Sequence, residues 1–201
     1  MKRENDPRET TTFKGATMSR KQEMKYPFVM TALFLAMFAS SSVLWAGSVT
    51  VGKPGVGDAA PLFSTDDIDG TRTVLDEALK SGKVVLLNFW GLRCSACIEE
   101  IGYLNPMYEK YKGKGVLFLG VNVDGVSSDV LKKSIPALSN IPRFPVLPDP
   151  DFKISDLYNM LATPLSFVIG RDGKIVYRHD DFKPGDEKEL EAVVNSLLEE
   201  K

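Results

Sequence analysis

Two cysteines, Cys94 and Cys97, constrain this chain more than any other feature of its sequence. They are its only cysteines. They follow an apolar run, residues 84–90, that is typical of a buried strand, and they precede a stretch whose apolar residues recur at helical spacing, residues 98–111. At the start of a helix this spacing places both sulfurs within disulfide reach, and the first-turn N–H groups and the helix dipole favour a thiolate. The order strand, Cys-x-x-Cys, helix predicts a redox-active dithiol.

Two purely structural roles for these cysteines are disfavoured. A structural zinc ion takes four ligands, and His179 is the one further candidate in the sequence. A disulfide that closes so short a loop stabilises a fold little in the chain-entropy model. We therefore expect redox chemistry at this pair, with no bound metal and no cofactor other than the disulfide itself.

The composition is that of an ordinary globular protein. The chain has 201 residues, of which 43% are hydrophobic and 26% charged, enough for one domain with a substantial core. Its formal net charge of −2 gives no electrostatic reason to expect nucleic-acid binding.

The N-terminal part of the chain is expected to be a targeting segment. Residues 1–25 are a polar, basic leader that is long for a signal peptide, so Met18 and Met24 are alternative starts. Residues 26–46 are uncharged and largely apolar and predict either a cleaved secretory signal or, if uncut, a single N-terminal membrane anchor. Both outcomes place the rest of the chain in the periplasm or cell envelope. A dithiol there is either an oxidant or is supplied with electrons by a membrane thiol donor.

The remaining chain predicts a short linker and one α/β domain. Residues 47–56 are rich in Gly and Pro and predict the linker, and residues 57–201 predict the domain. Strands and helices alternate and are followed by a hairpin, with its turn at residues 171–173, and by a terminal helix, which favours a mixed sheet. The expected strands are residues 83–89, 115–123, 165–170 and 174–179, with an extended piece at 144–147. The expected helices are residues 74–80, 95–111, 127–138, 151–160 and 185–200.

Three motifs carry a resemblance to a known family. They are VVLLNFWGLRCSAC at residues 84–97, TPLSFVI at residues 163–169 and RDGKIV at residues 171–176. With these motifs, residues 57–200 resemble thioredoxin-fold proteins and, more narrowly, the exported thiol-disulfide oxidoreductases of the TlpA, ResA and CcmG type. The resemblance implies a thioredoxin-like three-layer α/β/α fold with a central mixed sheet, and thiol-disulfide exchange at the cysteine pair.

The chain departs from the family pattern close to the cysteines. Arg93 stands where members commonly carry Trp, and Ala96 stands where they commonly carry Pro. Because the residues between the cysteines tune the redox potential, the resemblance does not fix that potential here. Asn88 stands where cytoplasmic thioredoxins carry a buried Asp, which argues against a general cytosolic thioredoxin.

Three residues are expected to perform the exchange. Cys94, at the exposed helix terminus, is the expected nucleophile, and Cys97, one turn into the helix, is the expected buried, resolving thiol. Glu100 follows Cys97 by three residues and so lies on the same helix face. The resemblance implies that its carboxylate helps to move protons at the cysteines; the alternative is an exposed helix residue like Glu99.

Four further residues are expected on the substrate side. Arg93 either stabilises the Cys94 thiolate or is an ordinary solvated side chain. The resemblance implies a cis peptide bond between Thr163 and Pro164, with Thr163 backbone groups beside Cys94 and ready to pair with an extended client; the alternative is a trans proline that begins an edge strand. Trp90 is expected in the core or at the rim of the site.

The function expected from these residues is disulfide exchange with other proteins, in the reducing direction. By resemblance, apocytochrome c with an oxidised haem-binding cysteine pair is a client, and a membrane thiol donor re-reduces the protein. Two alternatives come from other classes: a copper chaperone that holds Cu(I) between the two thiolates, and a thiol peroxidase. Copper chaperones of related fold use a wider cysteine spacing and a distal His. The peroxidatic Pro-x-x-x-Thr-x-x-Cys loop is not matched by the residues before Cys94.

Overall fold

A computed structural model describes residues 52–199 of the chain. The expected leader, the expected signal or anchor and the first half of the expected linker lie outside these residues. In chain order the described elements are β1 (Ser64–Asp66), β2 (Arg72–Val74), α2 (Leu75–Lys80), β3 (Val84–Trp90), α3 (Ser95–Tyr111), β4 (Val116–Asn122), α4 (Ser128–Ser134), the 3-10 helix η1 (Ile135–Ala137), β5 (Val146–Pro148), α5 (Lys153–Leu157), β6 (Leu165–Ile169), β7 (Ile175–Asp180) and α6 (Glu187–Glu199).

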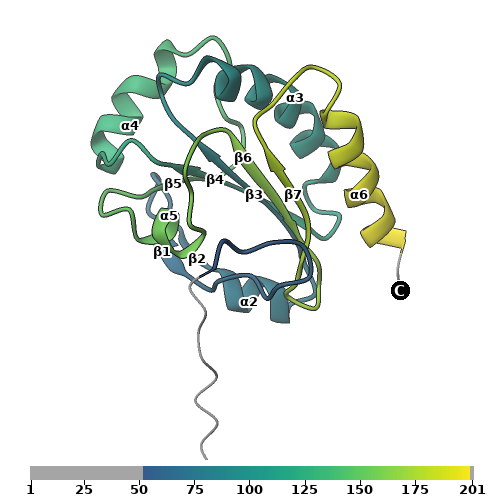
Figure 1. The fold of residues 1–201 in the computed structure, drawn as a ribbon. Coiled ribbons are helices and arrows are strands. Elements are labelled where there is room, and N and C mark those ends of the chain that lie inside the picture. Colours follow the sequence, from purple (N-terminus) through teal and green to yellow (C-terminus); the bar gives the residue numbers. More distant parts are fainter. Residues whose placement is uncertain (1–51, 200–201) are drawn as a thin grey trace, which may run out of the picture. The chain divides into compact units, whose positions relative to one another are not determined.

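A five-stranded mixed sheet in the order β5-β4-β3-β6-β7 forms the centre of the fold (Figure 1). β4 lies parallel to β3 and to β5, whereas β6 is antiparallel to β3 and to β7. β1 and β2 form a separate antiparallel hairpin. In Figure 1, α3 and α6 cover one side of the large sheet and α2 the other. This arrangement confirms the expected thioredoxin-like α/β/α fold.

The central strand β3 is buried along its whole length, and its side chains alternate between two apolar cores. Leu86 and Trp90 belong to the core shared with α3 and α6, and Leu87 and Phe89 to the core shared with α2 and α5. Successive residues of a strand point to opposite faces. Asn88 therefore points to the same side as Leu86 and Trp90, toward α3, and places a polar group inside that core.

The expected helix at residues 127–138 is interrupted. It begins after Ser127, as expected, but α4 ends at Ser134 and continues as the 3-10 helix η1. The physical reason is Pro136, which has no N–H to donate and crowds the preceding turn. The expected helix at residues 151–160 is also shorter, because it starts only after Phe152, whose φ of 57° is not helical.

The end of the expected linker is in contact with the sheet. The guanidinium Nη1 of Arg178, on β7, donates to the carbonyl oxygen of Pro54 at 2.9 Å, and Lys53 pairs with Asp180 at 3.2 Å. Pro54 is buried. Among residues 52–199, the longest apolar helix falls short of what a membrane crossing requires.

Candidate redox site

Asp124, just beyond β4, holds the loop that leads into the cysteine motif. Its Oδ2 accepts the backbone N–H of Leu92 at 2.7 Å and the side-chain amide of Asn122 at 2.7 Å. Since β3 and β4 are parallel, their carboxyl ends lie at the same edge of the sheet, where loops build sites. Neither Asn122 nor Asp124 was among the expected site residues. The available signal was a polar Asn-Val-Asp at the end of the strand predicted beside the motif strand.

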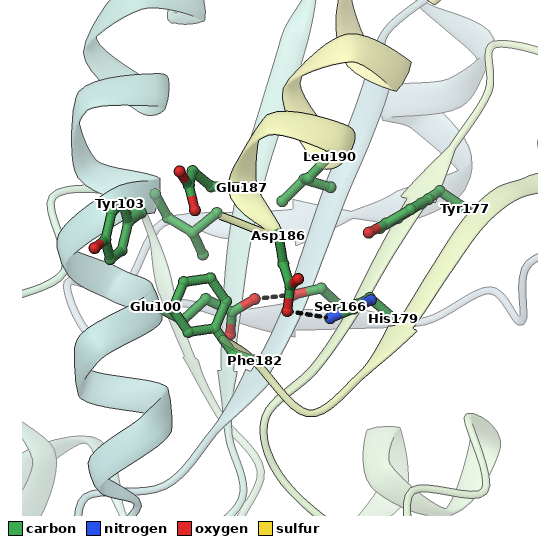
Figure 2. Close-up of a pocket in the computed structure, with 10 residues that line it drawn as sticks. Glu100, Tyr103, Ser166, Tyr177, His179, Phe182, Asp186, Glu187 and Leu190 are labelled. Carbon is green, nitrogen blue, oxygen red and sulfur yellow. Dashed lines mark hydrogen bonds and ion pairs between the residues drawn. The ribbon is translucent and has the colours of Figure 1, made fainter. Parts of the chain in front are cut away.

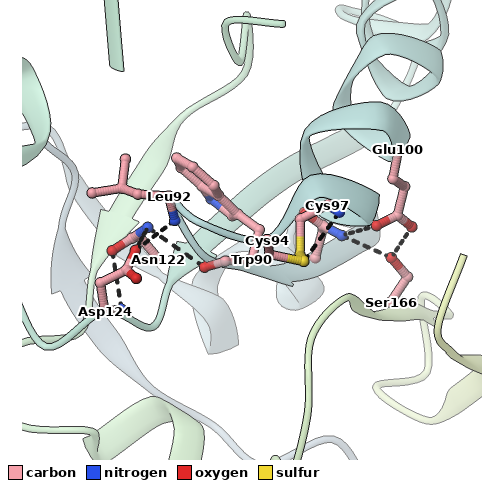
Figure 3. The surroundings of a disulfide bond; sticks show 9 residues. Trp90, Leu92, Cys94, Cys97, Glu100, Asn122, Asp124 and Ser166 are labelled. Atoms are coloured by element: carbon pink, nitrogen blue, oxygen red, sulfur yellow. Dashed lines mark hydrogen bonds between the residues drawn. A yellow bond between two sulfur atoms is a disulfide. The ribbon is translucent and has the colours of Figure 1, made fainter. Parts of the chain in front are cut away.

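The two cysteines differ in position and in exposure (Figure 3). They form a disulfide with a Cα–Cα distance of 5.2 Å. Cys94 is the N-cap residue of α3 and is partly exposed, and its Sγ accepts the backbone N–H of Cys97 at 3.1 Å. Cys97 is fully buried. An incoming disulfide can therefore reach only Cys94, whose thiolate would be stabilised by this N–H and by the helix terminus.

Glu100 is buried one helical turn beyond Cys97. Its side chain is enclosed between α3 and the sheet, so it is not the exposed helix residue of the alternative interpretation. Asn88 Nδ2 donates to its Oε2 at 2.8 Å and Ser166 Oγ donates to its Oε1 at 2.8 Å. Burial raises the pKa of Glu100 to about 7, and these two hydrogen bonds oppose that rise. A carboxyl group of this kind can take up or give back a proton near neutral pH.

Asn88 and Ser166 complete this buried polar cluster. Asn88 Nδ2 also donates to Ser166 Oγ at 3.0 Å, and the two residues are direct partners in the pairing of β3 with β6. Buried polar side chains are stable only when they bond to one another, so the three residues depend on each other. Local sequence patterns could not predict the contact between Glu100 and Ser166, because the two residues lie 66 positions apart in the chain.

Thr163, Pro164 and Arg93, three of the residues expected on the substrate side, can be placed in the structure. The peptide bond between Thr163 and Pro164 is cis, as expected. β6 pairs with β3 from Leu165 opposite Phe89 onward, so Thr163 lies at the end of the sheet from which the cysteine motif departs. Arg93 is exposed.

Trp90 takes the core position of the two that were expected for it. Its side chain is fully buried in the core beneath the site. It lies on the face of β3 that is covered by α3, because successive residues of the strand point to opposite faces.

His179, the further metal-ligand candidate in the sequence, lies on β7, is only partly exposed and is paired. Its Nε2 lies 3.0 Å from Oδ2 of Asp186, and its side chain retains 26% of its exposure. Within residues 52–199 no group of three or more His, Cys, Asp or Glu side chains is arranged to hold a metal ion.

The fold and the site together define a class of protein. An N-cap cysteine paired with a buried cysteine on a thioredoxin-like sheet, with a buried carboxyl group one turn further on, is the arrangement of a thiol-disulfide oxidoreductase.

Comparison with known proteins narrows this class. The AhpC/TSA family profile matches residues 56–178, so the chain belongs to the AhpC/TSA family. It is similar to the thiol-disulfide oxidoreductase ResA of Bacillus subtilis, with 31% identity over 161 residues that cover 79% of this chain and 86% of that protein. Its identity with ResA of Bacillus anthracis is 37% over 124 residues, which cover 62% of this chain and 69% of that one.

Solved structures agree with the sequence relatives. A structure assigned as the thiol:disulfide interchange protein DsbE of Chlorobium tepidum superposes with a TM-score of 0.64 and 32% identity, over 72% of this chain and 99% of that one. A thiol:disulfide interchange protein from a Bacteroides species gives a TM-score of 0.58 and 28% identity, over 74% and 93% of the two chains. The protein is a thiol-disulfide oxidoreductase of the ResA and DsbE type.

Proposed function

We propose that this oxidoreductase works outside the cytosol as a reductase of protein disulfides, that apocytochrome c is a client, and that a thiol protein of the membrane re-reduces it. The uncharged apolar segment at residues 26–46 supports the location. The resemblance to exported ResA-type proteins supports the client and the donor. The Cys94–Cys97 disulfide is then the only redox group that the reaction needs.

The buried carboxyl group of Glu100 is the observation that carries the reducing direction. Dithiols whose reduced form is stabilised as a thiolate are strong oxidants. An ionised Glu100, buried and one turn from Cys97, opposes a second negative charge on the Cys97 sulfur. Thiolate stabilisation in the reduced form is thereby confined to Cys94, so the reduced form is less stable than it would be with two stabilised thiolates, which favours electron donation.

The first step of the proposed cycle takes place at Cys94. Its thiolate attacks one sulfur of the client disulfide, so that a Cys94–client S–S bond forms and the client S–S bond breaks. The departing client sulfur leaves as a thiolate and takes a proton from solvent. The buried Cys97 takes no part in this attack, since the client cannot reach it.

In the second step Cys97 resolves the mixed disulfide. The carboxylate of Glu100 accepts the Cys97 thiol proton, and the resulting thiolate attacks Cys94 Sγ. The Cys94–Cys97 bond forms, the Cys94–client bond breaks, and the second client thiolate leaves and is protonated by solvent. The client has gained two electrons and the enzyme has lost two. Reduction by the donor dithiol reverses these steps and returns the proton from Glu100 to Cys97.

The client proposal is tested by trapping in the native host. In Cys97→Ala the resolving thiol is absent, so clients are expected to remain bound to Cys94 as mixed disulfides that mass spectrometry can identify. Proteins with a Cys-x-x-Cys-His haem attachment motif should be among them. Cys94→Ala is the matched control, because its remaining thiol is buried and should capture nothing. Equal capture by both variants, or capture without any such protein, would contradict the proposal.

The location is tested with a reporter enzyme that is active only outside the cytosol, fused after Lys201. The full chain is expected to give an active reporter. A fusion that lacks residues 1–46 has lost the apolar segment and should give an inactive one. Activity from both fusions, or from neither, would remove the extracytoplasmic location.

A further inference from the structure

A row of polar side chains crosses three neighbouring strands of the sheet. Asn88 on β3 is the direct partner of Ser166 on β6, and Ser166 is the direct partner of His179 on β7. Side chains of directly paired residues point to the same face, with Cβ atoms about 4.5–5.5 Å apart. The face is the one covered by α3, from which Glu100 contacts the first two members of the row.

The row leads from the centre of the protein to its surface. Asn88 and Ser166 are buried, at 0% and 1% exposure. β7 is the last strand of the sheet, and the side chains of His179 and of its partner Asp186 are 26% and 33% exposed. Polar groups thus connect the carboxyl group of Glu100 with a solvent-accessible imidazole.

A small cavity lies along this row (Figure 2). The space open to the centre of a water-sized sphere is about 10 Å³, which is the lower limit for a cavity that holds one water molecule. Figure 2 shows the Glu100–Ser166 and His179–Asp186 hydrogen bonds on its wall. The lining residues include Glu100, Ser166, Tyr177, His179 and Asp186. Most of the lining surface is apolar, but Glu100, Ser166, Tyr177 and His179 would give one water polar partners there, between Ser166 and His179.

Tyr177 provides an independent sign of a polar occupant. Its hydroxyl oxygen is buried, lines the cavity, and makes no hydrogen bond to any residue among 52–199. Buried hydroxyl groups are nearly always hydrogen-bonded, so this group calls for a partner in the cavity. Its ring stacks on His179, with centroids 6.0 Å apart and planes 8° apart, which fixes the imidazole against the cavity wall.

We propose that His179, held by Asp186, is the outer end of a proton path that connects Glu100 with solvent through Ser166 and one water. The proposal rests on the role of Glu100 in the proposed function. After resolution, protonated Glu100 donates to Ser166 Oγ, the Ser166 proton passes to the water, and a water proton passes to the ring nitrogen of His179 that is not bonded to Asp186, since Nε2 already donates its proton to that carboxylate. The imidazole then releases a proton to solvent. Re-reduction of the disulfide runs the same transfers inward.

The charged and titratable groups around the cavity come from several elements. Tyr103 belongs to α3, Tyr177 and His179 to β7, and Asp186 and Glu187 to the start of the α6 segment. A positive charge on His179 lowers the pKa of Glu100, and the negative charge on Asp186 raises it. The pKa of Glu100 therefore depends on the charges of both His179 and Asp186, as expected for groups that share a proton path. Histidine suits the outer position because imidazoles exchange protons near neutral pH.

The test measures the rate of proton release separately from the rate of disulfide formation. Reduced protein is mixed with a small aromatic disulfide whose thiol products stay ionised at pH 7 and so take up no proton, and a pH indicator in weak buffer reports the Cys97 proton that is released after Cys94–Cys97 forms. In the wild type, release should keep pace with disulfide formation. In His179→Gln, which keeps a polar group opposite Asp186, the first disulfide should form at the normal rate, while proton release should slow about tenfold or more. Added imidazole should restore the rate.

Two further variants complete the test. Asp186→Asn keeps an acceptor oxygen for the Lys183 N–H but removes the charge that supports imidazolium, so it should also slow release. Asp181→Asn, an exposed residue outside the cavity lining, should not. Normal release in His179→Gln, or slow release that imidazole does not restore, would overturn the path. A different result would show that Glu100 is not the proton acceptor of the proposed function. In that case Glu100→Gln would leave the rate of Cys94–Cys97 disulfide formation unchanged.

Discussion

Glu100→Gln is expected to remove a loss of stability that the oxidised wild type suffers as the pH rises. The pKa of Glu100 is about 7 in the folded protein, against 4.5 for the ordinary group, because burial penalises its charged form. Between these values the folded state holds a proton that the unfolded state has released, so the free energy of unfolding falls as the pH rises through this window. The loss is of order 3 kcal/mol once the pH is above about 8.

Urea unfolding at a series of pH values measures this effect. Gln is neutral throughout; its oxygen can still accept from Asn88 Nδ2, and its NH2 group can donate to Ser166 Oγ, which reverses that hydrogen bond. The curve of the variant should therefore be flatter, and the variant should be more stable than the wild type at about pH 8. Glu99→Gln is the matched control, since Glu99 is the exposed neighbour on the same helix and its loss should leave the wild-type pH dependence in place. Parallel curves for the wild type and Glu100→Gln would mean that the carboxyl group ionises freely.

Glu100→Gln is also expected to slow resolution of the mixed disulfide. Gln cannot accept the Cys97 proton, so Cys97 must wait for deprotonation by solvent, from which it is fully shielded. Removal of a positioned general base costs about 10²-fold or more in rate. The first step should be nearly unaffected, because Cys94 attacks as a thiolate stabilised at the helix N-terminus. The variant should therefore accumulate the Cys94–client intermediate.

Much of the fold follows from local sequence patterns. The apolar run before Cys94 and the hairpin turn at residues 171–173 mark β3, β6 and β7 with errors of one or two residues. Local patterns are less informative where the spacing of apolar residues favours a helix but a proline within it opposes one. At residues 127–138 the helical spacing continues through Pro136, whose missing N–H ends the α-helix early.

The chemistry of the site was predicted in part. The spacing of Cys94, Cys97 and Glu100 places all three near one face of α3, but spacing alone does not distinguish the buried Glu100 from the exposed Glu99. That distinction depends on which side of α3 packs on the sheet. The hydrogen-bond partners of Glu100 could not be predicted for a related reason. Asn88 and Ser166 lie side by side only because of the register in which β3 pairs with β6.

Trp90 illustrates the same difficulty. In a strand that is apolar throughout, the sequence does not indicate which residues face which layer. The structure resolves this through alternation: Trp90 lies on the same side as Asn88 and so belongs to the core beneath α3. The row from Asn88 through Ser166 to His179 likewise becomes visible only when three strands are aligned.

The central claim is that Glu100 takes the proton of Cys97 during resolution, and the pH dependence of that single step tests it most directly. A mixed disulfide between Cys94 and a chromophoric thiol is prepared in the reduced protein at low pH, and release of the thiol is followed by stopped-flow absorbance from about pH 5 to 9. For the wild type we expect the rate to rise through a pKa near 7 and then to level off. For Glu100→Gln we expect a much slower rate that climbs steadily with pH. Superimposable profiles for the two proteins would contradict the account.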